Sequence, residues 1–382
     1  MDQQRDKFYL PEDVVYLNNA FMAPNLKAVE AAGHQGVSRK NLPFDIKIDD
    51  FFKPVEKVKQ SFSKIINNQE IERIAIIPSV SYGIASVARN IKPKSYGNIV
   101  VAAEQFPSNF YAWKRFADTY DLQIRTVRPP ETLEKGKGWN QAIIENIDKQ
   151  TVVVAIGNVH WADGTLFDLK PIRRACDENQ VYLVIDGTQS VGALPINVNE
   201  IQPDALICAG YKWLFGPYSM GLAYYGPKFD NGIPIEENWI NRKGSENFQA
   251  LVNYEENYHP LARKYNMGEC SNFISIPMMQ AALDQINEWT VEKIAAYTKA
   301  LVDPFLDDLS RIGGHIEDPA YRSNHLFGIK LHKHFKIDKI KEAFAARNIY
   351  VSFRGNSMRV STHLYNRPKD FEILLDTLKA CE

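Results

Sequence analysis

The sequence predicts an α/β protein: a large domain built on a mostly parallel, mixed sheet, followed by a smaller α+β domain. Short apolar runs alternate with segments of helix length, a pattern typical of strands and helices that succeed one another along the chain. The runs are apolar at almost every position, as expected for strands that helices cover on both faces. Near residue 275 this alternation gives way to a long amphipathic segment over 277–300.

The expected elements follow in chain order. In the first region the apolar runs predict strands over residues 74–77, 98–102, 151–156, 181–185, 205–208 and 221–225. Between them, helical periodicity predicts helices over residues 55–66, 83–90, 109–120 and 171–179. After the segment 277–300 we expect strands over 324–330 and 358–362 and a last helix over 368–380. We therefore expect a large domain over residues 16–274 and a small domain over 275–382, with which residues 1–15 associate.

Length and composition limit the classes of function. With 382 residues, of which 45% are apolar and 24% charged, the chain is long enough for two domains. The net charge of −1 gives no reason to expect nucleic acid or an anionic membrane surface as a partner. The first residues are polar and no apolar run reaches membrane-spanning length, so we expect a cytoplasmic protein. The chain has four cysteines, and their spacing is not one that binds a metal: Cys176, Cys208, Cys270 and Cys381. We therefore expect free thiols and no metal site.

An acid and a lysine follow two of the predicted strands. Asp186 comes directly after the strand 181–185, and Lys212 follows the strand 205–208 among aromatic residues. Ligands of open α/β sheets bind beyond the carboxyl ends of the strands, where both side chains fall. A lysine amine can form a Schiff base with the aldehyde of pyridoxal phosphate, and a carboxylate can keep the ring nitrogen protonated. Alone, Asp186 could cap a helix and Lys212 could lie on the surface, but the pair favours this cofactor.

Polar or aromatic residues follow other strands as well. Ser79, Val80 and Ser81 precede a predicted helix, whose first backbone N–H groups could hold a phosphate. Phe106 could lie on the pyridine ring, although a loop phenylalanine is more often part of the core. Gln189 could reach the ring oxygen of the cofactor or, alternatively, bind only the backbone.

Two arginines near the carboxyl end are candidates for the substrate carboxylate. Arg359 begins a predicted strand of the small domain, and a guanidinium binds a carboxylate in two-pronged fashion. Arg354 is close in sequence and competes for the same role. A surface salt bridge is the alternative account, more so for Arg354 than for Arg359.

These motifs together resemble the class V aminotransferase family of pyridoxal-phosphate enzymes over nearly the whole chain. The family includes cysteine desulfurases, kynureninases, isopenicillin N epimerase-like proteins and C–S lyases. The resemblance rests on Asp-Gly-Thr-Gln-Ser at 186–190, Gly-Tyr-Lys-Trp at 210–213, Tyr-Leu-Asn-Asn-Ala at 16–20 and the segment 359–366. It implies an aspartate-aminotransferase-like fold, pyridoxal 5'-phosphate as cofactor, an amino-acid substrate, and a homodimer with its sites at the interface.

The resemblance also implies individual roles. Lys212 would bind the aldehyde and Asp186 the ring nitrogen, with Gln189 at the ring hydroxyl and Arg359 at the substrate carboxylate. Asn158 would also approach the ring hydroxyl, unless a shift of register brings His160 or Trp161 there. The other positions that the family pattern matches are Val80 and Ser81 at the phosphate, Phe106 stacked on the ring, Tyr211 where desulfurases carry histidine, and Ala209 in place of a phosphate-binding serine.

A further segment resembles the part of the family fold that completes the phosphate pocket of the neighbouring subunit. It would place Glu269 and Ser271, with Tyr265, at the partner's cofactor, and Cys270 would be the thiol nearest the site. Asn19 is expected at the substrate, with Arg242 and His259 as further candidates.

The departures from the family pattern bear on the reaction. Desulfurases carry a nucleophilic cysteine on a loop before the carboxyl-terminal arginine, but here the segment 351–358 is short and has none. The pattern that remains, including the segment 363–366, looks closest to the epimerase-like and C–S lyase branch. We therefore expect a reaction at Cα or Cβ of an amino acid, with β-elimination favoured and transamination as the alternative. A binding protein or regulator without turnover is disfavoured because Lys212, Asp186 and Arg359 are all present.

Overall fold

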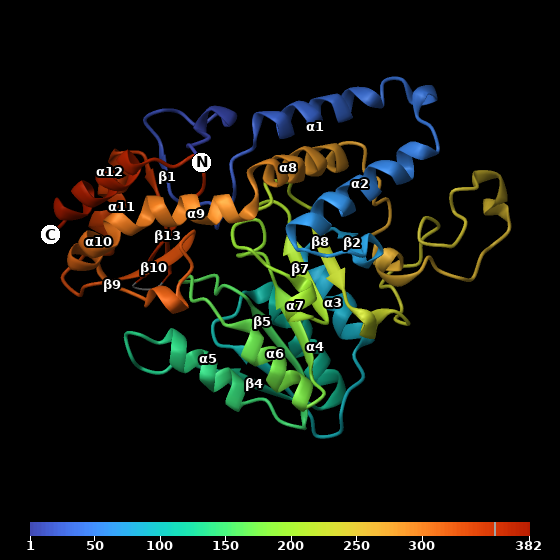
Figure 1. The fold of residues 1–382 in the computed structure, drawn as a ribbon, viewed down its shortest axis with the longest axis horizontal. Coiled ribbons are helices and arrows are strands. Elements are labelled where there is room, and N and C mark those ends of the chain that lie inside the picture. Colours follow the sequence, from blue (N-terminus) through green and yellow to red (C-terminus); the bar gives the residue numbers. More distant parts are fainter. Residues whose placement is uncertain (355–356) are drawn as a thin grey trace.

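The computed structural model describes residues 1–354 and 357–382. A seven-stranded sheet forms the centre of the larger part of the chain (Figure 1). Across the sheet the strands follow the order β2 (Ile74–Ile77), β8 (Gly221–Tyr225), β7 (Ala205–Ala209), β6 (Tyr182–Asp186), β5 (Thr151–Gly157), β3 (Asn98–Ala102) and β4 (Gln123–Val127). Six of the seven strands run in the same direction and β8 runs in the opposite one, so the mixed, mostly parallel sheet expected from the sequence is confirmed.

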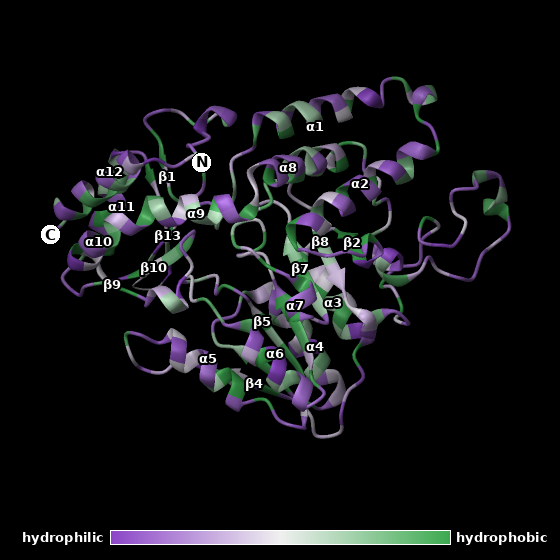
Figure 2. Ribbon diagram, in the orientation of Figure 1, coloured by the Kyte–Doolittle hydropathy of each residue, from purple (hydrophilic) through white to green (hydrophobic). Residues whose placement is uncertain are grey.

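Helices cover both faces of this sheet because its strands carry apolar side chains on both faces. Side chains such as Ile76, Val154 and Ile185 belong to the core on one face, which is covered by α2 (Asp49–Ile65), α5 (Gly136–Glu145), α6 (Leu169–Glu178) and α8 (Ser275–Trp289). Alternate residues, such as Ile77, Ala155 and Val184, pack on the other face under α3 (Val80–Asn90) and α4 (Tyr111–Tyr120). Figure 2 shows the apolar strands between helices whose outer sides are polar. The remaining helices before α8 are α1 (Lys27–Arg39), which packs on α8, and the short α7 (Val198–Ile201).

The carboxyl-terminal part forms a second core around an antiparallel sheet. Its strand order is β12 (Ser352–Arg354), β13 (Ser357–Ser361), β10 (Leu326–Leu331) and β9 (Gly314–Ile316). The helices of this part are α9 (Val291–Val302), α10 (Leu306–Gly313), α11 (Ile337–Ala346) and α12 (Pro368–Lys379). Two residues of the segment 351–358 that sequence analysis singled out, Gly355 and Asn356, lie outside the described residues.

The amino-terminal segment packs with the second core. Val15 and Leu17 belong to the same apolar cluster as buried apolar side chains between Leu301 and Leu378. In addition, β1 (Val15–Tyr16) pairs in parallel with β11 (Ile349–Tyr350). The apolar side chains of α8, in contrast, belong to the core of the large sheet. The domain boundary near residue 275 stays a prediction.

The long amphipathic segment 277–300 contains parts of two helices. In the structure α8 ends at Trp289 and α9 begins at Val291. Thr290 between them has a φ of 63° and caps α9 by accepting a hydrogen bond from the Lys293 N–H at 3.4 Å. The break turns the chain from the large sheet towards the small domain (Figure 1). No helix of the described residues is long and apolar enough to cross a membrane.

Candidate active site

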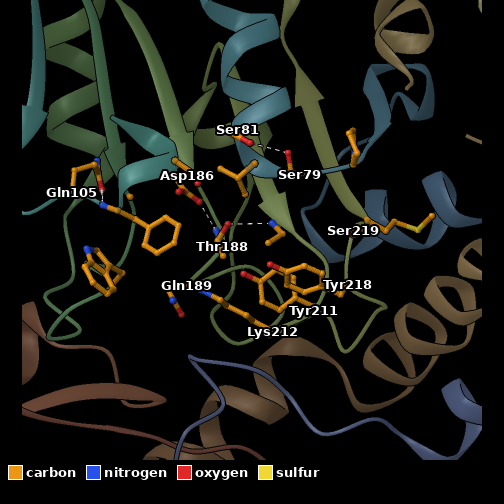
Figure 3. Close-up of a pocket in the computed structure, with 18 of the residues that line it drawn as sticks. Ser79, Ser81, Gln105, Asp186, Thr188, Gln189, Tyr211, Lys212, Tyr218 and Ser219 are labelled. Atoms are coloured by element: carbon orange, nitrogen blue, oxygen red, sulfur yellow. Dashed lines mark hydrogen bonds between the residues drawn. The ribbon is translucent and has the colours of Figure 1, made fainter. Parts of the chain in front are cut away.

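A cavity of about 280 Å³ opens at the edge of the large sheet where the parallel strands end. Residues that follow β2, β3, β5, β6 and β7 line it, and so do Ser219 and Met220, which precede the antiparallel β8. Figure 3 shows how side chains from these separate segments point towards one space. The topology therefore brings together residues that are more than 100 positions apart in the sequence.

Lys212 is buried in the wall of this cavity. Its side chain is 6% exposed, and its Nζ atom lies 5.4 Å from the ring centroid of Phe106 and 5.6 Å from that of Tyr211. The pKa of Lys212 is lowered to about 8, chiefly by burial; the charge of Asp186 opposes this shift, and the charges of Arg359 and Arg354 contribute to it. An amine with this pKa is partly neutral near neutral pH, as nucleophilic and base chemistry requires.

Asp186 is the carboxylate of the cavity. It is the last residue of β6, is 8% exposed, and accepts a hydrogen bond from the Thr188 backbone N–H at 3.0 Å. Burial raises the pKa of Asp186, while the Thr188 hydrogen bonds and the charge of Lys212 act in the other direction. A buried carboxylate of this kind is stabilised by a protonated nitrogen placed beside it.

The start of α3 forms a polar cradle at one end of the cavity. Ser79 caps the helix by accepting a hydrogen bond from the Tyr82 N–H at 3.2 Å, and its Oγ lies 2.9 Å from the Oγ of Ser81. The first turn of α3 carries no acidic residue. Free N–H groups, two hydroxyls and the positive end of the helix dipole suit a phosphate.

Gln189 lines the cavity next to Lys212 and is 4% exposed. Its Oε1 accepts a hydrogen bond from the indole N–H of Trp213 at 2.8 Å, and its Nε2 donates to the carbonyl oxygen of Ala20 at 3.2 Å. Sequence analysis left open whether this glutamine faces the cofactor or binds the backbone. In the structure Gln189 binds both a backbone carbonyl and the Trp213 side chain and also lies in the cavity wall, so its contact with the cofactor stays a prediction.

From the last residue of β5 onwards, the residues point alternately towards the cavity and away from it. Gly157, Val159 and Trp161 line the cavity, whereas Asn158 and His160 do not. Asn158 donates to the carbonyl oxygen of Phe167, and the ring nitrogens of His160 lie 3.2 Å from Asp163 and 3.1 Å from the carbonyl oxygen of Ala103. Successive side chains of an extended chain point to opposite sides, so only every second residue reaches the cavity. The structure thus turns Asn158 and His160 away from the cavity and places Trp161 in its wall.

Arg359 and Arg354 both lie against Trp161. Arg359, 1% exposed, donates to the Trp161 carbonyl oxygen at 2.6 Å and to the Ser352 hydroxyl at 3.2 Å. Arg354 has its guanidinium carbon 5.1 Å from the Trp161 ring centroid. Among the described residues neither arginine has a carboxylate within 4.0 Å, so the surface salt bridge considered as an alternative is absent for both.

Several predicted residues are not brought to the cavity of this chain. Glu269 is exposed, Ser271 is buried, and neither lines the cavity; the predicted role of both lies in a neighbouring subunit and stays a prediction, as does the homodimer. Asn19 is fully buried, accepts from the Tyr365 hydroxyl at 3.1 Å, and has no hydrogen-bond partner for its Nδ2 among the described residues. Arg242 and His259 bind within the segment 237–259, and Tyr265 donates to the Phe229 carbonyl oxygen.

Other residues of the cavity wall were not singled out from the sequence. They include Gln105, Ser108, Thr188, Tyr218 and Ser219. Thr188 lies inside the segment 186–190, where its hydroxyl accepts a hydrogen bond from the Ala209 N–H at 3.1 Å and so ties the turns after β6 and β7 together. Gln105 directly precedes Phe106 and could have been found on that ground. Tyr218 and Ser219 carry no local signal, because they reach the cavity only through the antiparallel direction of β8.

Comparison with known sequences identifies the family. The profile of the family described as aminotransferase class-V matches residues 32–373. The chain belongs to the class V aminotransferase family. An uncharacterized aminotransferase, YcbU of Bacillus subtilis (strain 168), is 23% identical over 85% of this chain and 83% of its own length. Isopenicillin N epimerase of Streptomyces clavuligerus is 22% identical over 48% of this chain and 46% of its own, and cysteine desulfurases are among the further matches.

A solved structure shows the same fold. The cystine C–S lyase C-DES, in complex with its reaction product cysteine persulfide, superimposes with a TM-score of 0.84 at 17% identity, covering 96% of this chain and 97% of that one. This likeness confirms the predicted aspartate-aminotransferase-like α/β fold. Membership of the family makes the protein a pyridoxal-phosphate-dependent enzyme.

The residues of the cavity fit this cofactor. A buried lysine with a lowered pKa can hold the aldehyde, a buried carboxylate can pair with the ring nitrogen, Phe106 offers an aromatic face, and the start of α3 suits the phosphate. Among the described residues no group of three or more His, Cys, Asp or Glu side chains could hold a metal ion.

Proposed function

We propose that this enzyme is a C–S lyase, which eliminates a sulfur substituent from Cβ of an amino acid. The observation that carries the proposal is the make-up of the cavity wall: it contains a lysine and a carboxylate, but none of the described residues that line it is a cysteine. A desulfurase needs a thiolate of its own to take up the sulfur. Without one, the sulfur has to leave directly with the eliminated group.

The thiols elsewhere in the chain do not offer a replacement. Cys176, Cys208 and Cys270 are buried, and burial raises the pKa of Cys176 to about 12, that of Cys270 to about 11 and that of Cys208 well above its usual value. A buried thiol with a raised pKa is a poor nucleophile. Cys381, the fourth cysteine, is the second residue from the carboxyl end and does not line the cavity.

The side chains of the cavity can perform the elimination. Bound pyridoxal phosphate supplies a ring that withdraws electrons from Cα. Arg359 does not itself line the cavity but donates to the carbonyl oxygen of Trp161, which does. This buried cation, which has no carboxylate partner among the described residues, would bind the substrate carboxylate, and Lys212, once free of the aldehyde, would take the proton from Cα. The Cβ–S bond then breaks and its electron pair leaves with the sulfur. Hydrolysis of the remaining three-carbon fragment gives pyruvate and ammonia, so the reaction needs no oxidant or reductant.

The experiment that tests this proposal separates three outcomes at one site. The purified holoenzyme is incubated with cystine or a thioether amino acid, without a keto acid, and pyruvate is followed together with the absorbance of the cofactor. We expect many moles of pyruvate per mole of enzyme and a cofactor spectrum that returns to its starting form. One equivalent of aminated cofactor, reversed by a keto acid, would instead make the enzyme an aminotransferase, and loss of optical activity without pyruvate would make it an epimerase.

Two variants serve as controls for this experiment. Lys212→Ala should form no pyruvate, because the base at Cα is gone. Cys270→Ser should keep its activity within about twofold, since a thiol outside the cavity takes no part in elimination. Loss of turnover in the Cys270 variant, with its fold intact by circular dichroism, would contradict the lyase proposal and point to a thiol-dependent mechanism.

A further inference from the structure

The side-chain amide of Gln189 can adopt only one orientation in this structure. Its oxygen faces the indole N–H of Trp213, which can only donate, and its nitrogen faces the carbonyl oxygen of Ala20, which can only accept. A flipped amide would place two donors against each other on one side and two acceptors on the other. The nitrogen of Gln189 carries a second hydrogen, and the side chain lies in the cavity wall beside Lys212 (Figure 3).

The three alternative candidates for the ring oxygen of the cofactor are engaged elsewhere. The ring nitrogens of His160 face Asp163 and the carbonyl oxygen of Ala103. Asn158 turns away from the cavity and donates to the Phe167 carbonyl oxygen at 3.3 Å. The single N–H of Trp161 donates to the Glu104 carbonyl oxygen at 2.7 Å. Of the residues that the sequence placed at this oxygen, Gln189 is therefore the one left to face it.

The backbone of Gln189 is held from the small domain. The Nε2–H of His325, in the turn before β10, donates to the Gln189 carbonyl oxygen at 2.7 Å. The His325 ring also stands edge-on to the Trp213 ring, with centroids 4.4 Å apart. Both contacts are fully buried, since Trp213 and His325 are each 0% exposed.

We propose that Trp213 is a positioning residue: its indole N–H fixes the amide of Gln189 so that the amide nitrogen donates to the ring oxygen of the cofactor, and His325 holds the backbone of Gln189 in place from the small domain. The inference rests on pyridoxal phosphate in this cavity and not on the type of reaction. His325 stays a neutral donor near neutral pH, because burial lowers its pKa to about 4.

Trp213→Phe tests the proposal, because it removes the N–H and keeps an aromatic ring in the core. The readout is the pH titration of the visible absorbance of the bound cofactor. An N–H at the ring oxygen stabilises the negative charge on that oxygen; without it, the proton between the oxygen and the Lys212 nitrogen is held more tightly. We expect the midpoint of the titration to rise by about one pKa unit, the size of one lost charge-assisted hydrogen bond.

A matched control lies in the same aromatic cluster. Trp289 is 2% exposed, and its indole N–H donates to Gln4 at 3.2 Å, away from Gln189. Trp289→Phe should leave the midpoint at its wild-type value, and Gln189→Ala should raise it as Trp213→Phe does. An unshifted midpoint in Trp213→Phe would overturn the proposal, whether or not the Gln189 variant shifts. A wild-type protein without a cofactor band would overturn the cofactor assignment as well, so the two failures are distinguishable.

A second pair of variants guards against loss of folding in Trp213→Phe. His325 and His363 are both fully buried and lie on two sides of Trp213, but neither ring nitrogen of His363 has a hydrogen-bond partner among the described residues. His325→Phe should raise the midpoint, whereas His363→Phe should leave it unchanged. Equal shifts in both variants would mean that packing, rather than the hydrogen bond to Gln189, sets the cofactor's spectrum.

Discussion

At the residue scale, Arg359 lowers the stability of the fold but is available to bind the carboxylate of a substrate. It is a fully buried cation, and among the described residues no carboxylate neutralises it. Burial, with a smaller contribution from the charge of Arg354, lowers the pKa of Arg359 to about 9. Because the folded chain holds this proton less tightly than the unfolded chain, the charge opposes folding at all pH values below about 9. The opposition disappears only as pH rises towards the ordinary pKa of arginine.

Replacing Arg359 by glutamine should therefore change binding and stability in opposite directions. We expect KM for the amino acid to rise about 10- to 100-fold, the worth of one hydrogen bond to a charged group, with a smaller effect on kcat. The melting temperature of the ligand-free protein at pH 7 should rise, because a buried charge is removed. Steady-state kinetics and calorimetry measure both effects. A lower melting temperature with an unchanged KM would show that Arg359 is structural, and a larger KM effect of Arg354→Gln would move the carboxylate role to Arg354.

At the element scale, the start of α3 serves both the helix and the cofactor. Ser79 caps the helix, and the first turn lacks the acidic residues that commonly stabilise a helix start. We infer that their absence leaves the start of α3 free to bind a phosphate. A carboxylate added there would stabilise α3 itself and repel the phosphate.

Ser81→Asp separates these two effects. Ser81 is exposed at the second position of α3, where a negative charge favours the helix dipole by about 0.3–1 kcal/mol. The ligand-free variant should thus unfold at the same or a higher temperature than the wild type. Its affinity for pyridoxal phosphate should fall at least about tenfold through repulsion between the charges. Ser81→Asn is the neutral control of the same size. Equal affinities of the two variants would place the phosphate elsewhere.

The elements that the sequence predicted best are the buried ones. β2, β3 and β8 have the expected bounds, because continuous apolar runs occur where helices cover both faces of a sheet. β4 was missed: it is one of the two edge strands and, unlike β2 at the other edge, it is partly exposed and contains Gln123, Arg125 and Thr126. The break at Thr290 was missed because the apolar periodicity continues across it, and only the positive φ interrupts the helix.

At the scale of the whole molecule, only those site residues could be predicted that the neighbouring sequence makes recognisable. Asp186 and Lys212 were found because Asp186 ends a recognisable strand and Lys212 follows another by three residues, and the topology brings both to one edge of the sheet. The direction of Asn158 and His160 could not be predicted, since a shift of one residue moves a side chain to the other face. The contact of His325 with Gln189 joins two residues that are 136 positions apart and has no signal in the sequence around either of them.

The central claim is that Lys212 holds the cofactor in the cavity at the edge of the large sheet. The most direct measurement mixes cofactor-free protein with pyridoxal phosphate at a series of pH values, fixes the adduct with borohydride, and maps the labelled peptide by mass. A lysine attacks an aldehyde as the neutral amine, so the rate of capture should rise with pH around the Lys212 pKa of about 8 and then level off. We predict one label, on Lys212, that is absent in Lys212→Ala. A label on another lysine, or none, would contradict the account.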